Sequence, residues 1–249
     1  MTGMDEPDVL LWFIRSIQKF AHKYSLREAA DLYGQLCADI ITYYRKQNHP
    51  RALLHRNGLI WVDGIKRPAT WMNATENGWP INPRTGYVVE INALWYNAML
   101  FTAEMLREMG KETSADLMEY QANIAKDAFV KTFWNGVYLY DFVINDYADK
   151  EVRPNMIWAV GLPFSPLDKR QQKAVVDICT KELLTPRGLR SLSPKSGHYR
   201  PMYYGNQVER DRSLHNGVVW PSTIAAYSRA YMQVYKHSGV AFMERALIG

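Results

Sequence analysis

Cysteine is nearly absent from this sequence. The 249 residues include only Cys37 and Cys179, and both fall on apolar faces of predicted helices. Small secreted domains use cysteines as disulfides, and structural zinc sites use them in closely spaced pairs. The sequence therefore predicts neither a disulfide framework nor a cysteine metal site, and it favours a protein of the reducing cytoplasm.

Long apolar runs and clusters of one charge are also missing. No run approaches the roughly 18 apolar residues that a membrane helix needs, and residues 1–8 are acidic where a secretion signal has a basic start. The 30 Lys and Arg residues are scattered among 25 Asp and Glu residues, so the net charge of +5 forms no basic run. We expect a cytoplasmic protein with no membrane segment and no nucleic-acid partner.

Sequence signatures of cofactor chemistry are missing as well. There is no phosphate-binding loop, no dinucleotide glycine pattern, no histidine pair at zinc spacing and no Gly-x-Ser-x-Gly motif. We therefore expect no metal and no nucleotide cofactor.

Aromatic residues, by contrast, are abundant. They make up 13% of the chain, and four of the eight tryptophans lie in or beside predicted loops: Trp61, Trp71, Trp79 and Trp220. A single tryptophan usually fills a core. Several of them outside the helical stripes favour a second use, because indole faces stack on sugar rings.

Helical periodicity covers most of the chain. Ser25 followed by Glu28 has the pattern of a helix cap, and apolar positions such as Phe13, Leu32 and Leu36 recur at helical spacing. Proline, glycine and the loss of periodicity mark two long loops at 50–88 and 186–220, with a short strand at 59–62 and a hairpin at 136–147. The predicted helices are 7–23, 25–46, 90–109, 113–133, 153–162, 165–183 and 221–236.

The loops fall before every other helix, which predicts two layers. If alternate helices form an inner ring, the loops gather at one end of it, where the helix N-termini also point. We predict an all-α fold, with residues 1–249 forming one domain that is an incomplete helical ring of seven or eight helices. An open ring exposes apolar faces, so we also expect self-association.

One loop-to-helix junction concentrates polar and aromatic residues. Residues 70–74 read Thr-Trp-Met-Asn-Ala, and Arg84, Glu90 and Asn92 follow within residues 82–98. A buried Glu90 could contact sugar hydroxyls or titrate with a raised pKa, but residue type alone slightly favours the alternative that it complements the helix dipole. Arg84 has two equally good interpretations, ligand binding or clamping loop carbonyls.

These segments resemble the glycogen debranching enzyme family, in its amylo-α-1,6-glucosidase part. Residues 71–98 are similar to the family's TWMDA, PR.G and VEINALWYNA segments. Further stretches match in the same order along nearly the whole chain: residues 8–13, 153–165, 188–194 and 215–221.

The resemblance implies a cytoplasmic glycoside hydrolase with a ring of six helix pairs, an (α/α)6 toroid. It would remove α-1,6-linked glucose from glycogen or limit dextrin with inversion, using one carboxyl as acid and one carboxylate as base. Asn73 occupies the position of the family's acid, and an amide cannot serve as a proton donor. Either the role would move to another carboxyl such as Glu90, or residue 73 would only hydrogen-bond substrate. The resemblance implies no metal and no organic cofactor.

The base is expected beyond Gly249, with Glu209 and Asp211 as candidates inside the chain. His215 could contact a glucose hydroxyl or be a structural donor, and Asn155 could cap a helix or contact sugar. The predicted substrate-binding residues, taken from the matching motifs, are Asp8, Trp12, Trp71, Arg84, Asn92, Trp95, Tyr96, Asn155, His215 and Trp220.

Two other functions remain open at this point. The chain could be a glucan-binding module that has lost proton transfer, which Asn73 favours. It could also be another helical-ring glycosidase, such as a glucoamylase or trehalase, because fold alone does not separate these activities.

Overall fold

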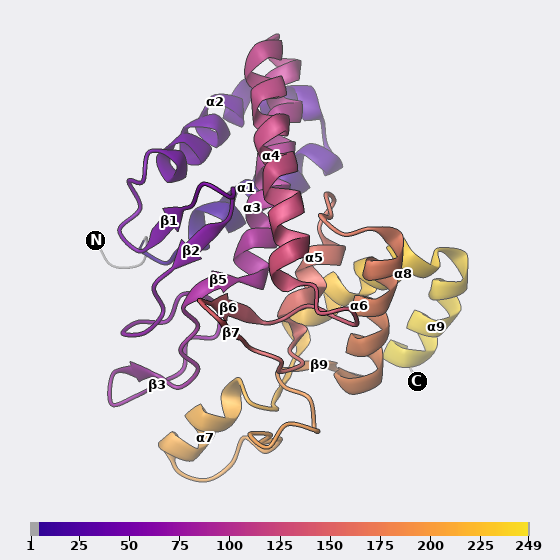
Figure 1. The fold of residues 1–249 in the computed structure, drawn as a ribbon. Helices are drawn as coiled ribbons and strands as arrows, with labels where there is room; N and C mark the ends of the chain where they lie inside the picture. Colours follow the sequence, from indigo (N-terminus) through magenta and orange to yellow (C-terminus); the bar gives the residue numbers. More distant parts are fainter. Residues whose placement is uncertain (1–4, 249) are drawn as a thin grey trace.

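The computed structural model describes residues 5–248, and this part of the chain is mostly helical (Figure 1). The α-helices are α1 (Val9–Lys23), α2 (Leu26–Arg45), α3 (Val89–Glu108), α4 (Glu112–Phe133), α5 (Trp158–Gly161), α6 (Lys169–Glu182), α7 (Gln207–Leu214), α8 (Ile224–Tyr235) and α9 (His237–Ile248). Two short 3-10 helices, η1 (Pro154–Ile157) and η2 (Pro221–Thr223), lead directly into α5 and α8.

Three small antiparallel sheets form within the loops. The largest has the strand order β1-β2-β5-β6-β7, the second has the order β10-β9-β8, and β3 pairs with β4. The strands are β1 (Ala52–Leu54), β2 (Ile60–Val62), β3 (Thr75–Glu76), β4 (Trp79–Pro80), β5 (Gly86–Val88), β6 (Phe142–Ile144), β7 (Tyr147–Ala148), β8 (Leu184–Thr185), β9 (Gly188–Arg190) and β10 (Val219–Trp220). The all-α prediction therefore needs correction, because the loops contain more paired strands than the sequence indicated.

The helix predictions are otherwise confirmed, with differences at the ends. Ser25 caps α2 as expected, accepting a hydrogen bond from the Glu28 N–H at 3.2 Å. The predicted helix 165–183 begins only at Lys169, because Asp168 forms a reciprocal capping box with Gln171. The helices α7 and α9 were not predicted.

The buried faces of α1 and α2 match the expected ones only in part. Phe13, Leu32 and Leu36 are exposed, although their spacing placed them on apolar faces. The reason on α2 is close packing by small residues: a Cβ on Gly34 would lie 2.4 Å from the sulfur of Met109. Small side chains thus determine which face of α2 packs inward.

The contacts between the helices follow the alternation that the sequence predicted. In one layer α1 contacts α3, α3 contacts α5, and α5 contacts α8; α2 and α4 pack against α3, and α6 packs against α8. The loops with β3, α7 and β9 lie together at one end, at the bottom of Figure 1. Within residues 5–248, no helix combines the length and apolar character needed to cross a membrane.

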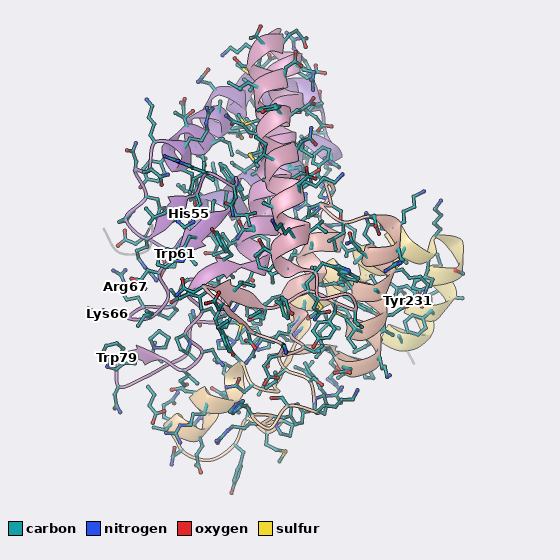
Figure 2. The ribbon with its side chains drawn as sticks, viewed as in Figure 1. His55, Trp61, Lys66, Arg67, Trp79 and Tyr231 are labelled. Atoms are coloured by element: carbon teal, nitrogen blue, oxygen red, sulfur yellow. The ribbon has the colours of Figure 1, made fainter. Side chains whose placement is uncertain are left out.

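The aromatic residues of the loops have two kinds of environment. His55 stacks on Trp61 with 6.5 Å between ring centroids, on the largest sheet. Trp79, on the β3-β4 hairpin, points outward from the loop end (Figure 2) and is 55% exposed. Trp61 is therefore part of a packed ring pair, whereas Trp79 presents its ring to solvent.

The contact between α5 and α8 depends on Gly161. A Cβ at this position would lie 2.6 Å from the carbonyl oxygen of Ala226. We expect Gly161→Ala to lower the free energy of unfolding by about 1–3 kcal/mol, the usual cost of overpacking, as measured by urea denaturation. Gly197→Ala is the matched control, since nothing lies within 4 Å of its added Cβ. Equal stability of the two variants would contradict this view of the contact.

Candidate functional site

A buried ion cluster of Arg84, Glu90 and Asp141 links the loop-to-helix junction at residues 82–98 to the largest sheet. The Nη2 of Arg84 donates to Glu90 Oε2 at 2.7 Å, and its Nη1 donates to the other oxygen of this carboxylate. On its other edge, Arg84 Nε and Nη2 donate to the two carboxylate oxygens of Asp141 at 2.7 and 2.9 Å. The guanidinium is thus held by two carboxylates at once, in the paired geometry that gives strong charge-assisted bonds.

Local structure brings these three residues together. Glu90 lies in the first turn of α3, Arg84 precedes β5, and Asp141 precedes β6, which pairs with β5. All three side chains are at most 3% exposed. Burial alone would lower the pKa of Arg84, but the two carboxylates raise it, so the guanidinium stays charged.

A second arginine and an amide extend the cluster. Asn155 donates to Asp141 Oδ1 at 2.7 Å, and Arg153 Nε lies 4.0 Å from Asp141 Oδ2. Arg153 also donates to the carbonyl of His215 at 2.6 Å and to Asn216 Oδ1 at 3.1 Å. The ion cluster is therefore connected to the 186–220 loop.

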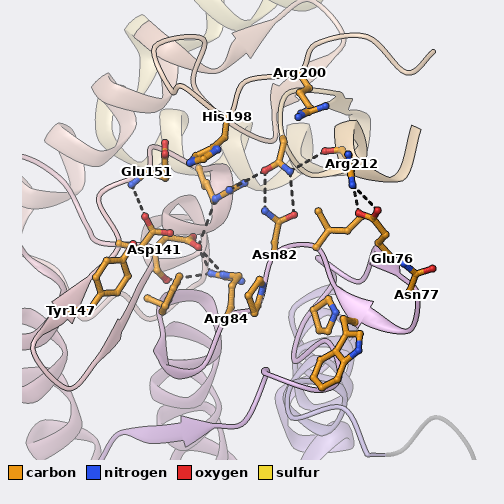
Figure 3. Close-up of a pocket in the computed structure, with 18 residues that line it drawn as sticks. Glu76, Asn77, Asn82, Arg84, Asp141, Tyr147, Glu151, His198, Arg200 and Arg212 are labelled. Atoms are coloured by element: carbon orange, nitrogen blue, oxygen red, sulfur yellow. Dashed lines mark hydrogen bonds and ion pairs between the residues drawn. The ribbon is translucent and has the colours of Figure 1, made fainter. Parts of the chain in front are cut away.

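A cavity of about 650 Å³ opens beside this cluster (Figure 3). Its charges balance, because its lining contains as many carboxylates as guanidinium groups. These charged residues are Glu76, Asp141, Asp149, Glu151, Arg84, Arg153, Arg200 and Arg212. A cavity of this size, with no excess of one charge, suits a polar neutral ligand.

Amides and aromatic rings complete the lining. Asn82 donates to Asn216 Oδ1 at 2.9 Å, and Arg212 forms two hydrogen bonds with Glu76, at 2.8 and 2.6 Å (Figure 3). Trp79 and Tyr147 also line the cavity. The cavity thus combines hydrogen-bonding groups with flat apolar faces, the combination that sugars require.

Three predicted residues form an aromatic cluster next to this network. The imidazole of His215 stacks on Trp220 and meets Trp71 edge-on, with 5.2 Å between ring centroids in both pairs. Trp71 Nε1 donates to Asn155 Oδ1 at 2.8 Å. Trp71, Asn155, His215 and Trp220 are therefore brought together, as the motifs suggested.

Asn73 lies at the edge of the aromatic cluster with an exposed side chain. Its backbone N–H donates to His215 Nε2 at 3.1 Å, so the neutral imidazole has its hydrogen on Nδ1. Burial, with the charges of Arg153 and Arg84, lowers the pKa of His215 to about 3. The residue at position 73 is thus held through its backbone while its side chain faces outward.

Other predicted residues have structural contacts instead. The Asn92 amide donates to the carbonyls of Ile60 and Val88, each at 3.0 Å, and Trp95 Nε1 donates to the Gly58 carbonyl at 3.0 Å. Tyr96 is buried in the core beside them. None of these three residues lines the 650 Å³ cavity, although Trp95 lines a separate pocket of about 290 Å³.

The four remaining predicted residues also lie outside the cavity lining, and so do Asn73, Glu90, Trp71, Asn155, His215 and Trp220; Arg84 is the predicted residue that lines it. Asp8 is buried and accepts a hydrogen bond from Trp12 Nε1 at 3.1 Å, and burial raises its pKa to about 7. Glu209 belongs to the capping box of α7, and Asp211 accepts a hydrogen bond from Gln207.

Four acidic residues of the cavity, Glu76, Asp141, Asp149 and Glu151, were not predicted from the sequence. Burial and the charge of Asp141 raise the pKa of Asp149. A signal was present, since Asp141 interrupts an aromatic segment between Tyr140 and Phe142. A charge at such a position indicates a buried partner.

Two comparisons with known proteins give concordant results. The family described as amylo-alpha-1,6-glucosidase matches residues 4–247. A glycogen debranching enzyme of Saccharomyces cerevisiae is similar to the chain, with 26% identity over 223 residues that cover 70% of this chain and 14% of that enzyme. The chain therefore spans a small part of the length of this relative.

The contacts of Glu90 predict a structural contribution. Glu90→Gln keeps the side-chain shape but leaves Arg84 with one carboxylate partner, and breaking a buried ion pair costs about 3 kcal/mol or more. We expect a loss of that size in the free energy of unfolding, measured by urea denaturation. Asp31→Asn is the control, since its pair with Arg27 is exposed and should contribute nothing measurable. If both variants match the unmodified chain, Glu90 is free for another role.

The lowered pKa of His215 predicts sensitivity to acid. Its folded pKa of about 3 lies below the ordinary histidine pKa of 6.5, so its stabilising effect is complete above pH 6.5 and is lost as the pH falls toward 3. Between pH 7 and pH 4 we expect the chain to lose about 3 kcal/mol more than His215→Gln, measured by denaturation at each pH. If the free energy of unfolding falls equally with pH in the unmodified chain and in His215→Gln, the imidazole is not held neutral.

Proposed function

The chain belongs to the amylo-alpha-1,6-glucosidase family, and from this premise we propose that it is part of an α-glucan hydrolase that removes α-1,6-linked glucose from glycogen or limit dextrin. One observation carries the proposal. The position of the family's acid, residue 73, projects an exposed side chain beside the Trp71, His215 and Trp220 cluster. The ligand would be a neutral glucan, which the balanced charges of the cavity accommodate.

The proposed mechanism is inverting hydrolysis. It requires an acid that protonates the leaving oxygen and a base that activates water, with carboxyl groups roughly 6.5–9.5 Å apart. Glu90 could serve as the acid only by leaving Arg84, whereas Asp149 lines the cavity and has a raised pKa. We therefore add Asp149 to the candidates for the acid. Glu209 and Asp211 remain the proposed bases within the chain.

The domain proposal follows from the same family. We propose that residues 1–249 form part of one (α/α)6 domain, in which α1, α3, α5 and α8 belong to the inner layer. Their successive contacts support this arrangement. The exposed side chains of Phe13, Leu32 and Leu36 support the further proposal that the isolated chain associates with itself.

A second function is favoured by Asn73 itself. An amide in place of the acid would leave the aromatic cluster and the cavity amides able to hold a glucan without cleaving it. The chain would then be an α-glucan-binding module. Both proposals have an α-glucan as the ligand, and they differ in whether the side chain of residue 73 transfers a proton.

Measuring glucose released from phosphorylase limit dextrin tests both proposals. General acid catalysis contributes roughly 100- to 10,000-fold to such reactions. We expect Asn73→Asp to release glucose at least 100-fold faster than the unmodified chain, because the exposed side chain gains a carboxyl group at the family's position. Binding of the same dextrin, followed by calorimetry, should be unchanged.

Two further variants separate the possible acids. If the unmodified chain already releases glucose, loss of release in Asp149→Asn identifies Asp149 as the acid, and loss in Glu90→Gln at unchanged stability identifies Glu90. Dextrin binding with no release by any variant would favour the binding module. Absence of dextrin binding would contradict both functions.

A further inference from the structure

A second cavity, of about 430 Å³, carries only positive charge. It lies between α1, α8 and the turn that follows α5, and it shares no lining residue with the cavity described above. Its lining consists of Arg15, Lys19, His22, Lys23, Pro163 and Arg229. Two arginines and two lysines thus contribute four formal charges, and no acidic residue lines the cavity.

The cationic residues converge because of their helical spacing. Arg15, Lys19, His22 and Lys23 follow one another at intervals of four, three and one, so they share one face of α1. Arg229 projects from the facing helix, α8, and its Nη1 lies 3.4 Å from the carbonyl oxygen of Gly161. The lysines, His22 and Arg229 are exposed, so they form the rim of the cavity.

Arg15 forms the floor of this cavity and is only 4% exposed. Its Nη1 donates to Gln18 Oε1 at 3.0 Å, and Gln18 is in turn bonded to Asn97. Its Nε, however, is buried without a hydrogen-bond partner among the described residues. A buried charge needs a compensating partner, and Gln18 supplies only a neutral one.

The rim residues do not provide the missing negative charge either. Within residues 5–248, none of the five basic side chains that line this cavity takes part in an ion pair. Burial and the charge of Arg229 lower the pKa of Arg15 to about 10. Burial, with the charges of Arg15 and Arg229, also lowers the pKa of His22. These positively charged groups repel one another, and a bound anion would offset that repulsion.

We propose that this cavity binds a phosphate group, with Arg15 at its floor and Arg229, Lys19 and Lys23 at its rim. A phosphate dianion supplies more acceptor oxygens and more charge than a carboxylate, and guanidinium groups match its geometry. The volume exceeds that of a phosphate ion, so the group can belong to a small phosphomonoester such as a sugar phosphate. The site is independent of the proposed hydrolysis.

Calorimetry on the full chain tests the proposal with two probes, inorganic phosphate and glucose 6-phosphate, each compared with sodium chloride at equal ionic strength. We expect saturable binding of at least one phosphate probe and none of chloride. Arg229→Gln and Lys19→Gln should each weaken it about tenfold, which corresponds to one charge-assisted contact. Lys126→Gln, an exposed change on α4, should leave binding unchanged.

A spectroscopic measurement avoids dependence on the variants. The Nε–H signal of Arg15 should shift on titration with phosphate, because this donor gains its missing acceptor. Tighter binding of glucose 6-phosphate than of phosphate would identify an organic phosphate as the ligand, and equal binding would identify the free ion. The proposal is overturned if neither probe binds above chloride, or if binding occurs without a shift of the Arg15 signal.

Discussion

The ion pairs of the Arg84 guanidinium hold together the end of the protein at which the loops gather. The guanidinium joins Glu90 of α3, six residues along the chain, to Asp141, which lies 57 residues away, directly before strand β6 of the largest sheet. Removing either carboxylate would leave Arg84 with a single carboxylate partner in the interior. The paired strands β5 and β6 and the start of α3 are therefore fixed relative to one another by electrostatics as well as by packing.

The same cluster is connected by hydrogen bonds to the cavity and to the aromatic rings. Asn155 donates a hydrogen bond to Asp141 and accepts one from the Trp71 indole N–H. Arg153 connects Asp141 to the carbonyl of His215. Two arginines balance the carboxylates of Glu90 and Asp141, so the buried network is neutral as a whole. A neutral and rigid support suits a ligand without charge, because little reorganisation is needed when it binds.

Sequence reasoning was most successful where local rules decide the outcome. The Ser25 cap and the long periodic stretches gave the first four helices, and the motifs around Trp71 and His215 identified residues that meet in space. It was less successful where long-range contacts decide. The hydrogen bonds of Asn92 to Ile60 and the pairing of Arg84 with Asp141 depend on strand partners 32 and 57 residues away, and no local pattern specifies them.

The support of residue 73 through its backbone has an evolutionary consequence. Because His215 holds the main-chain N–H and the side chain is exposed, exchanging an amide for a carboxylate there changes neither a core contact nor the hydrogen bond. If residue 73 is the acid position, as proposed above, selection could add or remove reactivity there in a single step, with little penalty in folding. Descendants of one scaffold could then diverge into catalysts and carriers of the same polysaccharide while their architecture stays the same.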